Sequence, residues 1–385
     1  MNFDLSEEQI AFDNSLRRMV SEKYTLALRR EHQKSVKGYS EEVWGQLANL
    51  GVLGLNIAQE HGGHGGSSVD AIFVMNALGP ALLLEPLVPT CIVCASLLGA
   101  LGSEQQQAEI LPAIAHGRLT MTMAHAEPGS RYDLSRVTTS AERTATGWKL
   151  NGAKSVVPHA AQVGQLVVSA RISGEVDAAE GLALFLVDPA TPGLSIRDYT
   201  TIDGTRAGEI RLENVELNAS QQLGNHAGIL ECIELACDKA AAAYCAEAVG
   251  IMDALHALTV DYVKQRKQFG TTIGSFQAVQ HRLVDMIVMI EQARSLSYLA
   301  AIRTAGTDAA ARRVAVSAAK VMGAKAGKFV AQQAIQLHGG IGVTDEYICG
   351  HMAKRLFTLA ILFGDADSHL ERFIQTQDAH PEQFS

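Results

Sequence analysis

The sequence lacks three features that would each indicate a particular class of protein. No run of about 20 apolar residues is free of charge, so no membrane-spanning helix is expected. Six cysteines in 385 residues are too few for a disulfide scaffold. Basic residues are not in excess, because 32 Lys and Arg face 41 Asp and Glu. The resulting formal net charge of -9 would on average repel a nucleic-acid backbone. We therefore expect a cytoplasmic globular protein that binds neither membranes nor nucleic acid.

Cys91 and Cys94 form the one cysteine pair whose C-x-x-C spacing suits redox chemistry or zinc. Their flanks (VPTCIVCASLLGALG) are apolar and offer no second pair of ligands. Burial is the usual state of a free cysteine. We interpret both as buried thiols and expect no metal site.

The first 118 residues are typical of a helical domain. The acidic N-terminus (MNFDLSEEQI) predicts a helix capped by Ser6 rather than a signal peptide. Ser40 is placed to cap a further helix that Gly51 ends. The glycine-rich segment His61–Ser68 follows no strand and lacks the GK[ST] ending of a phosphate loop, so we interpret it as a tight turn.

The pattern changes near Leu119 and again near residue 225. Short β-branched segments between turn residues predict a β domain over residues 119–224. Residues 225–385 have long helical patterns, and Ala240–Gly250 is apolar on nearly every side, as in a helix buried among others. The expected fold is mainly α with a central β domain. The expected strands are Leu119–His125, Val137–Ser140, Gly147–Leu150, Gln165–Ile172, Leu182–Asp188 and Gly208–Val215, and the expected long helices Ile229–Lys264, Phe276–Thr304, Ala309–Leu337 and Glu346–Leu362.

Two segments of the helical C-terminal part carry groups that suit a phosphorylated ligand. In Arg266–Gly270 (RKQFG), two cations can meet a pyrophosphate, while Gln268 adds hydrogen bonds and Phe269 an apolar wall. A cationic helix end that balances the helix dipole explains the same residues equally well. In Gln336–Gly342 (QLHGGIG), paired glycines allow a ligand to approach the backbone closely.

The order of these segments along the chain resembles the acyl-CoA dehydrogenase family over nearly the whole length. The pieces that carry the resemblance are LSEEQ, LNIAQEHGGHGG, HAEPGS with the following Asp133, LNGAK, GEIRLENVEL, VKQRKQFGTTIGSFQAVQHRLVDM and IQLHGGIGVTDEY. More narrowly, SRYDL, GAKSVV, CAEAVGIMDALH and FGDAD are similar to the small subunit of pimeloyl-CoA dehydrogenase and to paired subunits of steroid-degrading dehydrogenases.

The resemblance implies a fold, a cofactor and a reaction. The fold would be a helical N-terminal domain, a β-barrel middle domain and a C-terminal four-helix bundle. FAD would accept a hydride from the β-carbon of an acyl-CoA while a carboxylate removes the α-proton. An electron-transfer flavoprotein would be the electron acceptor, and the assembly a homo- or hetero-oligomer arranged as a dimer of dimers.

Family contacts to FAD fall into two sets. One set grips the ADP half of a neighbouring subunit's FAD. It is matched by Arg266, Gln268, Phe269, Gln277, Gln336, Gly339 and Gly340. The other set, which holds the flavin ring of the subunit's own FAD, is altered at Ala126, Tyr132, Val156, Pro158 and Ala241.

The catalytic base has two candidates. Asp365 aligns with the family's glutamate but is one methylene shorter, and Asp367 and His369 fall where the family contacts flavin. Glu247 is a carboxylate in an apolar helix, where pairing with a cation is the usual outcome. The simpler interpretation of Asp365 is a helix N-cap.

Three functions fit this pattern. The favoured one is a partner subunit that clamps FAD in a heteromeric dehydrogenase acting on a dicarboxylyl-CoA or a steroid-derived acyl-CoA. The second is a self-sufficient homo-oligomer with Asp365 as base. The third is a flavin oxidase or monooxygenase on the same fold.

Overall fold

The structure is a computed structural model that describes residues 7–224 and 228–384. The chain forms two compact units, which are described separately. The first comprises the described parts of 1–30, 68–83 and 241–385, and the second comprises 31–67 and the described parts of 84–240. The predicted N-terminal segment 1–118 is therefore shared between both units. The predicted cap Ser6 lies outside the described residues.

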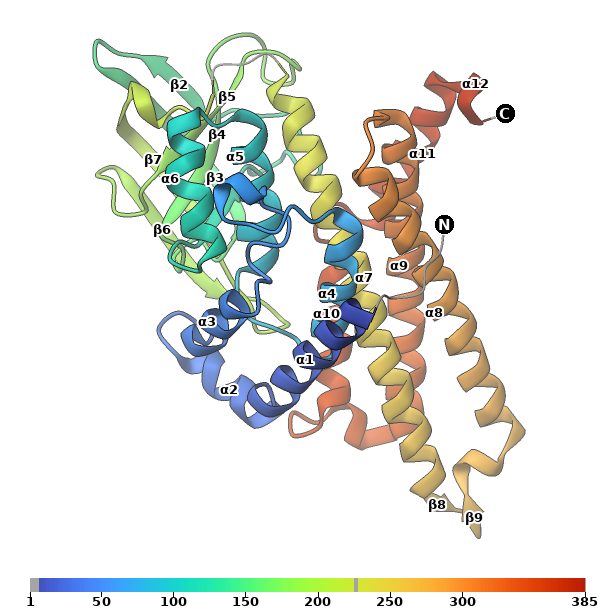
Figure 1. Cartoon of the computed structure of the whole chain (residues 1–385). Coiled ribbons are helices and arrows are strands. Elements are labelled where there is room, and N and C mark those ends of the chain that lie inside the picture. The colour runs from blue at the N-terminus through green and yellow to red at the C-terminus, as the bar shows by residue number, and fades with distance from the viewer. Residues whose placement is uncertain (1–6, 225–227, 385) are drawn as a thin grey trace. The chain divides into compact units, whose positions relative to one another are not determined.

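The first unit is a bundle of long helices (Figure 1). The four long helices with predicted bounds, which begin at residues 229, 277, 309 and 348, start and end within three residues of the prediction, and two further helices follow Asp365. The helices that lie in it wholly or in part are α1 (Glu7–Lys23), α2 (Leu26–Lys34), α4 (Ser68–Leu78), α7 (Ile229–Gln265), α8 (Gln277–Thr304), α9 (Ala309–His338), α10 (Ile348–Leu359), α11 (Ala366–Ala379) and α12 (Pro381–Phe384).

Close backbone packing explains a glycine in the middle of α7. A Cβ on Gly250 would lie 2.2 Å from the carbonyl oxygen of Asn76 on α4. A Cβ on Gly79, just after α4, would lie 2.6 Å from the carbonyl oxygen of Glu247. The two glycines let α4 and α7 touch through their backbones, which outweighs the low helix propensity of Gly250.

The second unit contains a curled seven-stranded sheet with the order β1-β4-β2-β3-β7-β6, and β5 pairs with β4. Its core consists of apolar side chains that alternate along the strands, among them Leu150, Phe185 and Ile210. The strands are β1 (Met121–Ala124), β2 (Ser140–Arg143), β3 (Gly147–Pro158), β4 (Gln165–Arg171), β5 (Leu182–Val187), β6 (Leu194–Thr200) and β7 (Arg206–Asn218).

Two aspects of the sheet were not predicted. The sequence pattern missed β6, because its residues are only partly buried and show little hydrophobic alternation. The sequence pattern also made no prediction of strand pairing, and β1 and β2 each pair with β4 in parallel. Strand pairing between distant segments depends on packing that spacing alone does not encode.

Helices and turns accompany the sheet in the second unit. Ser40 caps α3 (Glu41–Asn49) by accepting from the amide of Val43, and Gly51 follows the helix at φ 81°, both as predicted. Gly63 is required by packing, because a Cβ there would lie 2.1 Å from the carbonyl oxygen of Ile57. The remaining helices of this unit are η1 (Gln59–His61), the π-helix η3 (Val88–Cys94), α5 (Ala95–Leu101), α6 (Glu104–Ala115) and η4 (Ala219–Gln221).

Cys91 and Cys94 are free thiols buried in η3, as predicted. Burial raises the pKa of both thiols, so they are inert at neutral pH. Within residues 7–224 and 228–384, no group of His, Cys, Asp or Glu side chains is arranged to hold a metal ion. In the same ranges, no helix combines the length and apolar character that a membrane crossing needs.

Candidate flavin-binding segments and candidate bases

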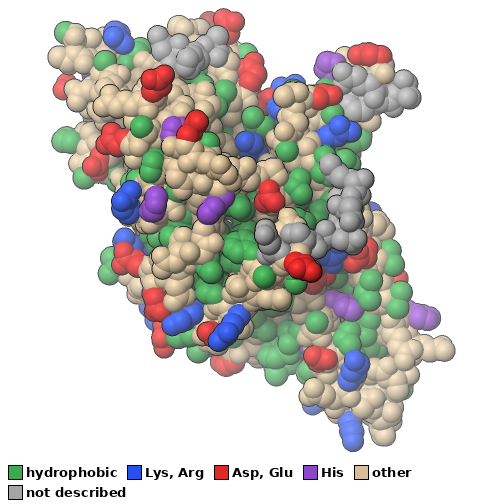
Figure 2. Space-filling view, in the orientation of Figure 1, with side chains coloured by type: hydrophobic (Ala, Val, Ile, Leu, Met, Phe, Trp, Pro, Cys, Tyr) green, Lys and Arg blue, Asp and Glu red, His purple; other side chains and the backbone are tan. Residues whose placement is uncertain are grey.

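The segment that contains Arg266 forms a small hairpin rather than the end of a helix. α7 ends at Gln265, and β8 (Lys267–Gln268) pairs with β9 (Thr271–Thr272). Phe269, at φ 56°, makes the turn with Gly270. Figure 1 places this hairpin at a tip of the bundle, and Figure 2 shows basic side chains gathered there.

The side chains of this hairpin are open to a ligand. Arg266 and Gln268 are exposed. Phe269 is 91% exposed, and its ring lies edge-on to Phe276 at 6.2 Å between centroids. Phe269 and Phe276 together form an exposed aromatic pair beside the hairpin. A cation, an amide and an uncovered ring can together receive a flat, negatively charged ligand.

The second segment is a glycine turn at the end of α9. Gly339 adopts φ 65° and ψ −143°, a conformation that essentially only glycine takes. Gly340 needs no such freedom, and a Cβ on either glycine would meet no atom within 4 Å. Packing within the chain therefore does not explain Gly340, whereas a ligand close to the backbone would. Gln336 is exposed one turn earlier.

A hydrogen bond joins the two segments, which are about 70 residues apart in sequence. The Tyr262 hydroxyl donates to the carbonyl oxygen of His338 at 3.2 Å. Tyr262 lies one turn before Arg266, whose amide donates to the Tyr262 carbonyl at 2.9 Å. Gln277 opens α8 after the hairpin and is exposed. Tyr262 and His338 were not among the predicted site residues, although their positions one turn before Arg266 and directly before Gly339 are signals in the sequence.

These residues fit the ADP half of FAD. Arg266 supplies a charge for the pyrophosphate, and Gln268, Gln277 and Gln336 supply amide groups for polar atoms. A Cβ on Gly340 would meet no atom within 4 Å, so the backbone there is open to a ligand. The role of these residues toward FAD stays a prediction from the family resemblance.

Asp365 is the N-cap of α11, which is the simpler of its two interpretations. Its carboxylate accepts from the amide of Ser368 at 2.9 Å. The two residues before it adopt positive φ, 55° at Phe363 and 111° at Gly364. A Cβ on Gly364 would lie 2.5 Å from Nε2 of His369, so this turn requires glycine. A capping carboxylate still has lone pairs for other chemistry, so the cap does not decide the question of the base.

Lys320 and His369 hold the loop that precedes Asp365. Lys320 on α9 is buried and donates to the carbonyl oxygens of Leu359 at 2.8 Å and Leu362 at 2.7 Å. Burial lowers its pKa to about 8. His369 is also buried, with Nε2 2.9 Å from the Phe363 carbonyl and Nδ1 3.2 Å from the Ser317 hydroxyl.

His369 thus has a role within the bundle, and its predicted flavin contact stays a prediction. Both of its ring nitrogens are bonded to this chain. Asp367, in contrast, is exposed in the first turn of α11.

Glu247 is paired, as expected of a carboxylate in an apolar helix. Arg355 on α10 binds it in a bidentate manner, with Nε–Oε1 at 2.6 Å and Nη2–Oε2 at 2.9 Å. The guanidinium also lies 5.6 Å from the centre of the Tyr244 ring. Both charged side chains are less than a tenth exposed. A base that had to accept a proton in this place would first have to give up two charge-assisted bonds.

The five positions at which the resemblance implies altered flavin-ring contacts are divided between the two units. Ala241, in the first unit, packs into an apolar cluster with residues that include Cys245, Ala300 and Val316. In the second unit, Val156 is exposed at φ 53°, a strained conformation for a β-branched residue. Pro158 faces Ala207 in the sheet without an amide hydrogen to donate. Ala126 is exposed, and Tyr132 is 40% exposed.

Glu127 and Lys154 connect two of the recognised sequence pieces, HAEPGS and LNGAK. Their ion pair, at 2.7 Å, is almost fully buried. Glu127 also accepts from the amides of Thr138 at 2.6 Å and Thr139 at 3.0 Å. Burial alone would raise the pKa of Glu127, but Lys154 and these donors lower it to about 2. The Glu127 carboxylate therefore has a structural role, because its bonds connect three segments of the sheet domain.

The same network continues to a buried histidine. Lys154 donates to the Ser169 hydroxyl at 3.0 Å, which in turn lies 2.9 Å from Nδ1 of His125. Nε2 of His125 lies 3.0 Å from the carbonyl oxygen of Leu134, so the neutral ring donates there. Burial, followed by the charge of Lys154, lowers the pKa of His125 to about 4.

We expect His125 to weaken the protein as the pH falls from about 6.5 to 4. The unfolded chain binds a proton at this histidine near pH 6.5, whereas the folded chain resists it until about pH 4. Stability is therefore full above 6.5 and falls by about 3 kcal/mol across this window. Denaturant titrations from pH 7 to 4 check this, because His125→Gln should reduce the slope of the free energy of unfolding against pH. An unchanged slope in this variant would contradict the assignment.

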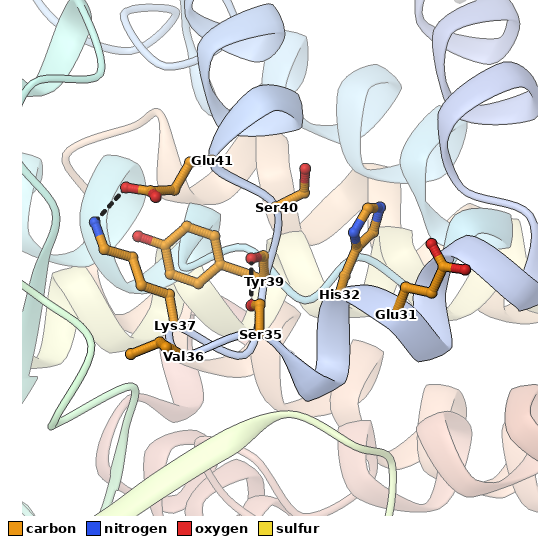
Figure 3. A pocket seen from close by; sticks show the side chains of 8 residues that line it. All are labelled: Glu31, His32, Ser35, Val36, Lys37, Tyr39, Ser40 and Glu41. Carbon is orange, nitrogen blue, oxygen red and sulfur yellow. Dashed lines mark hydrogen bonds and ion pairs between the residues drawn. The ribbon is translucent and has the colours of Figure 1, made fainter.

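A surface pocket of about 390 Å³ lies in the second unit at the turn between α2 and α3 (Figure 3). Two of its polar groups bond within the lining, Lys37 to Glu41 at 2.6 Å and the Ser35 hydroxyl to the Tyr39 carbonyl at 2.9 Å. None of the predicted site residues lines it. We assign it no function.

Comparisons with known proteins cover the whole of this architecture. Models of the acyl-CoA dehydrogenase N-terminal, middle and C-terminal domains match residues 6–118, 122–215 and 231–376. The probable acyl-CoA dehydrogenase YngJ of Bacillus subtilis is 28% identical, over 97% of this chain and 98% of that protein. The mitochondrial long-chain specific acyl-CoA dehydrogenase of Sus scrofa is 31% identical over 89% of this chain and 80% of its own length.

A solved structure agrees with the sequence relatives. A variant of the Tcur3481-Tcur3483 steroid ACAD has 28% sequence identity and a TM-score of 0.87, covering 98% of this chain and 99% of that chain. Taken with the matches to all three domains, this shows that the chain belongs to the acyl-CoA dehydrogenase family, whose members are FAD-dependent oxidoreductases that act on acyl-CoA.

Proposed function

We propose that this chain is the FAD-clamping subunit of a heteromeric acyl-CoA dehydrogenase. One observation carries the proposal: the residues for the ADP half of FAD are present and open, while those for the flavin ring are not. Arg266 and Gly340 represent the first group. Ala241, closed into an apolar cluster, and Pro158, which lacks an amide hydrogen, represent the second. A partner chain would supply the ring pocket.

Exposed apolar side chains on the bundle support an oligomer. On α8, Val284 is 57% exposed, Ile287 45% and Val288 49%. Figure 2 shows hydrophobic side chains along the edge where α8 runs in Figure 1. Apolar groups clustered on one helix face mark an interaction surface more often than a free one. We propose a dimer of dimers, homo- or heteromeric, in which this face meets another subunit.

In the proposed reaction, a carboxylate would remove the α-proton of an acyl-CoA thioester, and bound FAD would supply the acceptor for the hydride of the β-carbon. This chain's part is to bind and orient. Arg266 would neutralise pyrophosphate charge, and the glutamine amides would fix the position of the nucleotide. An electron-transfer flavoprotein would then accept the electrons.

We further propose a dicarboxylyl-CoA or a steroid-derived acyl-CoA as substrate. The support is similarity. SRYDL and FGDAD resemble segments of pimeloyl-CoA and steroid dehydrogenase subunits, and the solved structure with 28% sequence identity is named a steroid ACAD. We also retain 1–118, 119–224 and 225–385 as the proposed domain boundaries.

The FAD content of the purified protein tests the proposal. Expressed alone, the chain should contain clearly less than one FAD per chain and show no acyl-CoA-dependent bleaching. Expressed with the product of its neighbouring gene, it should co-purify with that product, gain FAD and gain activity. A full complement of FAD in the protein alone would contradict the partner-subunit role.

One observation favours a second function, a self-sufficient homo-oligomer with Asp365 as base. The loop before Asp365 is fixed by Lys320 and by His369, as a positioned catalytic group requires. A displacement of about 1 Å can lower a rate on the order of 100-fold, so the shorter side chain would need such positioning.

A further inference from the structure

Three aromatic side chains meet beneath the glycine turn. The imidazole of His338 lies between the ring of Tyr262 from α7, at 4.5 Å, and that of Tyr347 at the start of α10, at 5.2 Å. His338 is the last residue of α9 and is 3% exposed. The cluster therefore joins the ends of two helices to the beginning of a third.

Hydrogen bonds fix the orientation of each ring in this cluster. Nδ1 of His338 lies 2.8 Å from the Ala334 carbonyl oxygen, which can only accept, so Nδ1 carries the proton. Nε2 is then an acceptor for the Tyr347 hydroxyl at 3.2 Å. Burial lowers the pKa of His338, which keeps the ring neutral. The Tyr262 hydroxyl donates to the backbone of His338 rather than to its ring.

The cluster lies at the junction of the two nucleotide-binding segments. Tyr262 is one helical turn before Arg266, and the Arg266 carbonyl accepts from Ile273 at 2.9 Å to close the hairpin. His338 directly precedes Gly339, whose unusual backbone angles start the turn. The hydrogen bond from Tyr262 to His338 is thus a short connection between the cation and the open glycine backbone.

We propose that Tyr262, His338 and Tyr347 are positioning residues that set the spacing between the Arg266 hairpin and the Gly339–Gly340 turn. This inference rests on the proposed clamping of the ADP half of FAD by those segments. A ligand that spans both segments binds tightly only when their spacing is already correct, because any adjustment reduces the net binding free energy. None of the three side chains needs to touch the ligand.

Tyr262→Phe tests the proposal because it removes one hydroxyl and keeps the ring. With the assembled protein, we expect the dissociation constants of FAD and of competing ADP to rise by the same factor, about five- to tenfold. Tyr347→Phe should act in the same direction. Tyr298→Phe, which changes a half-buried tyrosine of α8 beside Phe73, is the matched control and should leave both constants unchanged.

A double-mutant cycle distinguishes positioning from general destabilisation. If Tyr262 acts through the spacing of the clamp, Tyr262→Phe should weaken ADP binding much less in an Arg266→Ala background. Additive effects, or no effect of Tyr262→Phe, would overturn the positioning role. If ADP does not compete with FAD even in the unaltered protein, the proposed clamp itself is wrong.

Discussion

Replacing Glu247 with glutamine is expected to lower the free energy of unfolding by about 3–5 kcal/mol. The change removes the negative charge from the bidentate pair with the buried guanidinium of Arg355, and breaking one side of a buried ion pair costs about that much. The bidentate geometry, at 2.6 and 2.9 Å, means that two charge-assisted bonds weaken together. Urea titration of the assembled protein at pH 7 measures the effect.

Two controls separate this explanation from others. Asp253→Asn makes the same chemical change on the same helix, in a pair with Arg294 that is partly exposed, and should cost at most about 1 kcal/mol. Glu247→Gln combined with Arg355→Met removes both charges and should recover much of the loss. A stable Glu247→Gln protein that has lost all thioester-dependent bleaching would instead make Glu247 the base.

Asp365→Asn provides the contrasting test of the other candidate base. Asparagine caps helices about as well as aspartate, so α11 should keep its N-cap and the protein its stability. Loss of bleaching with normal FAD content would then assign the base to this chain and favour the homo-oligomer. Unchanged bleaching of the co-expressed complex would agree with a base supplied by the partner.

Replacing Arg266 with alanine is expected to raise the dissociation constant of FAD by about 10- to 100-fold. A hydrogen bond to a charged group contributes about 1.5–3 kcal/mol, and Arg266 is the cation that we place on the pyrophosphate. Because its side chain is exposed, the stability of the protein should change by no more than about 0.5 kcal/mol. Recovery of flavin fluorescence on dilution of the assembled protein gives the constant.

Lys264→Ala is the matched control for this prediction. It removes one exposed cation near the end of α7, two residues before Arg266. Its effect on the dissociation constant of FAD should come only from long-range attraction and should disappear as salt is added. Equal effects of the two variants at high salt would mean that Arg266 makes no specific contact with the nucleotide.

The sequence alone determined most helices and strands and the family, and it supplied the residues of both proposed nucleotide-binding segments. These follow from local signals: the hydrophobic period in α7 to α9, the cap at Ser40, and the glycines of Gly339–Gly340, whose conformation or closeness to a ligand requires glycine. It also offered a catalytic and a structural interpretation of Asp365 and of Glu247, but it could not decide between them.

Only the tertiary structure decided which groups face one another. It bound Glu247 to Arg355 across 108 residues, tied His369 to Ser317 and Phe363, and joined the two nucleotide-binding segments through Tyr262. The parallel pairing of β1 and β2 with β4 is likewise known only from the tertiary structure. Such contacts depend on the packing of elements far apart in the chain, and no local periodicity records which buried polar group will meet which partner.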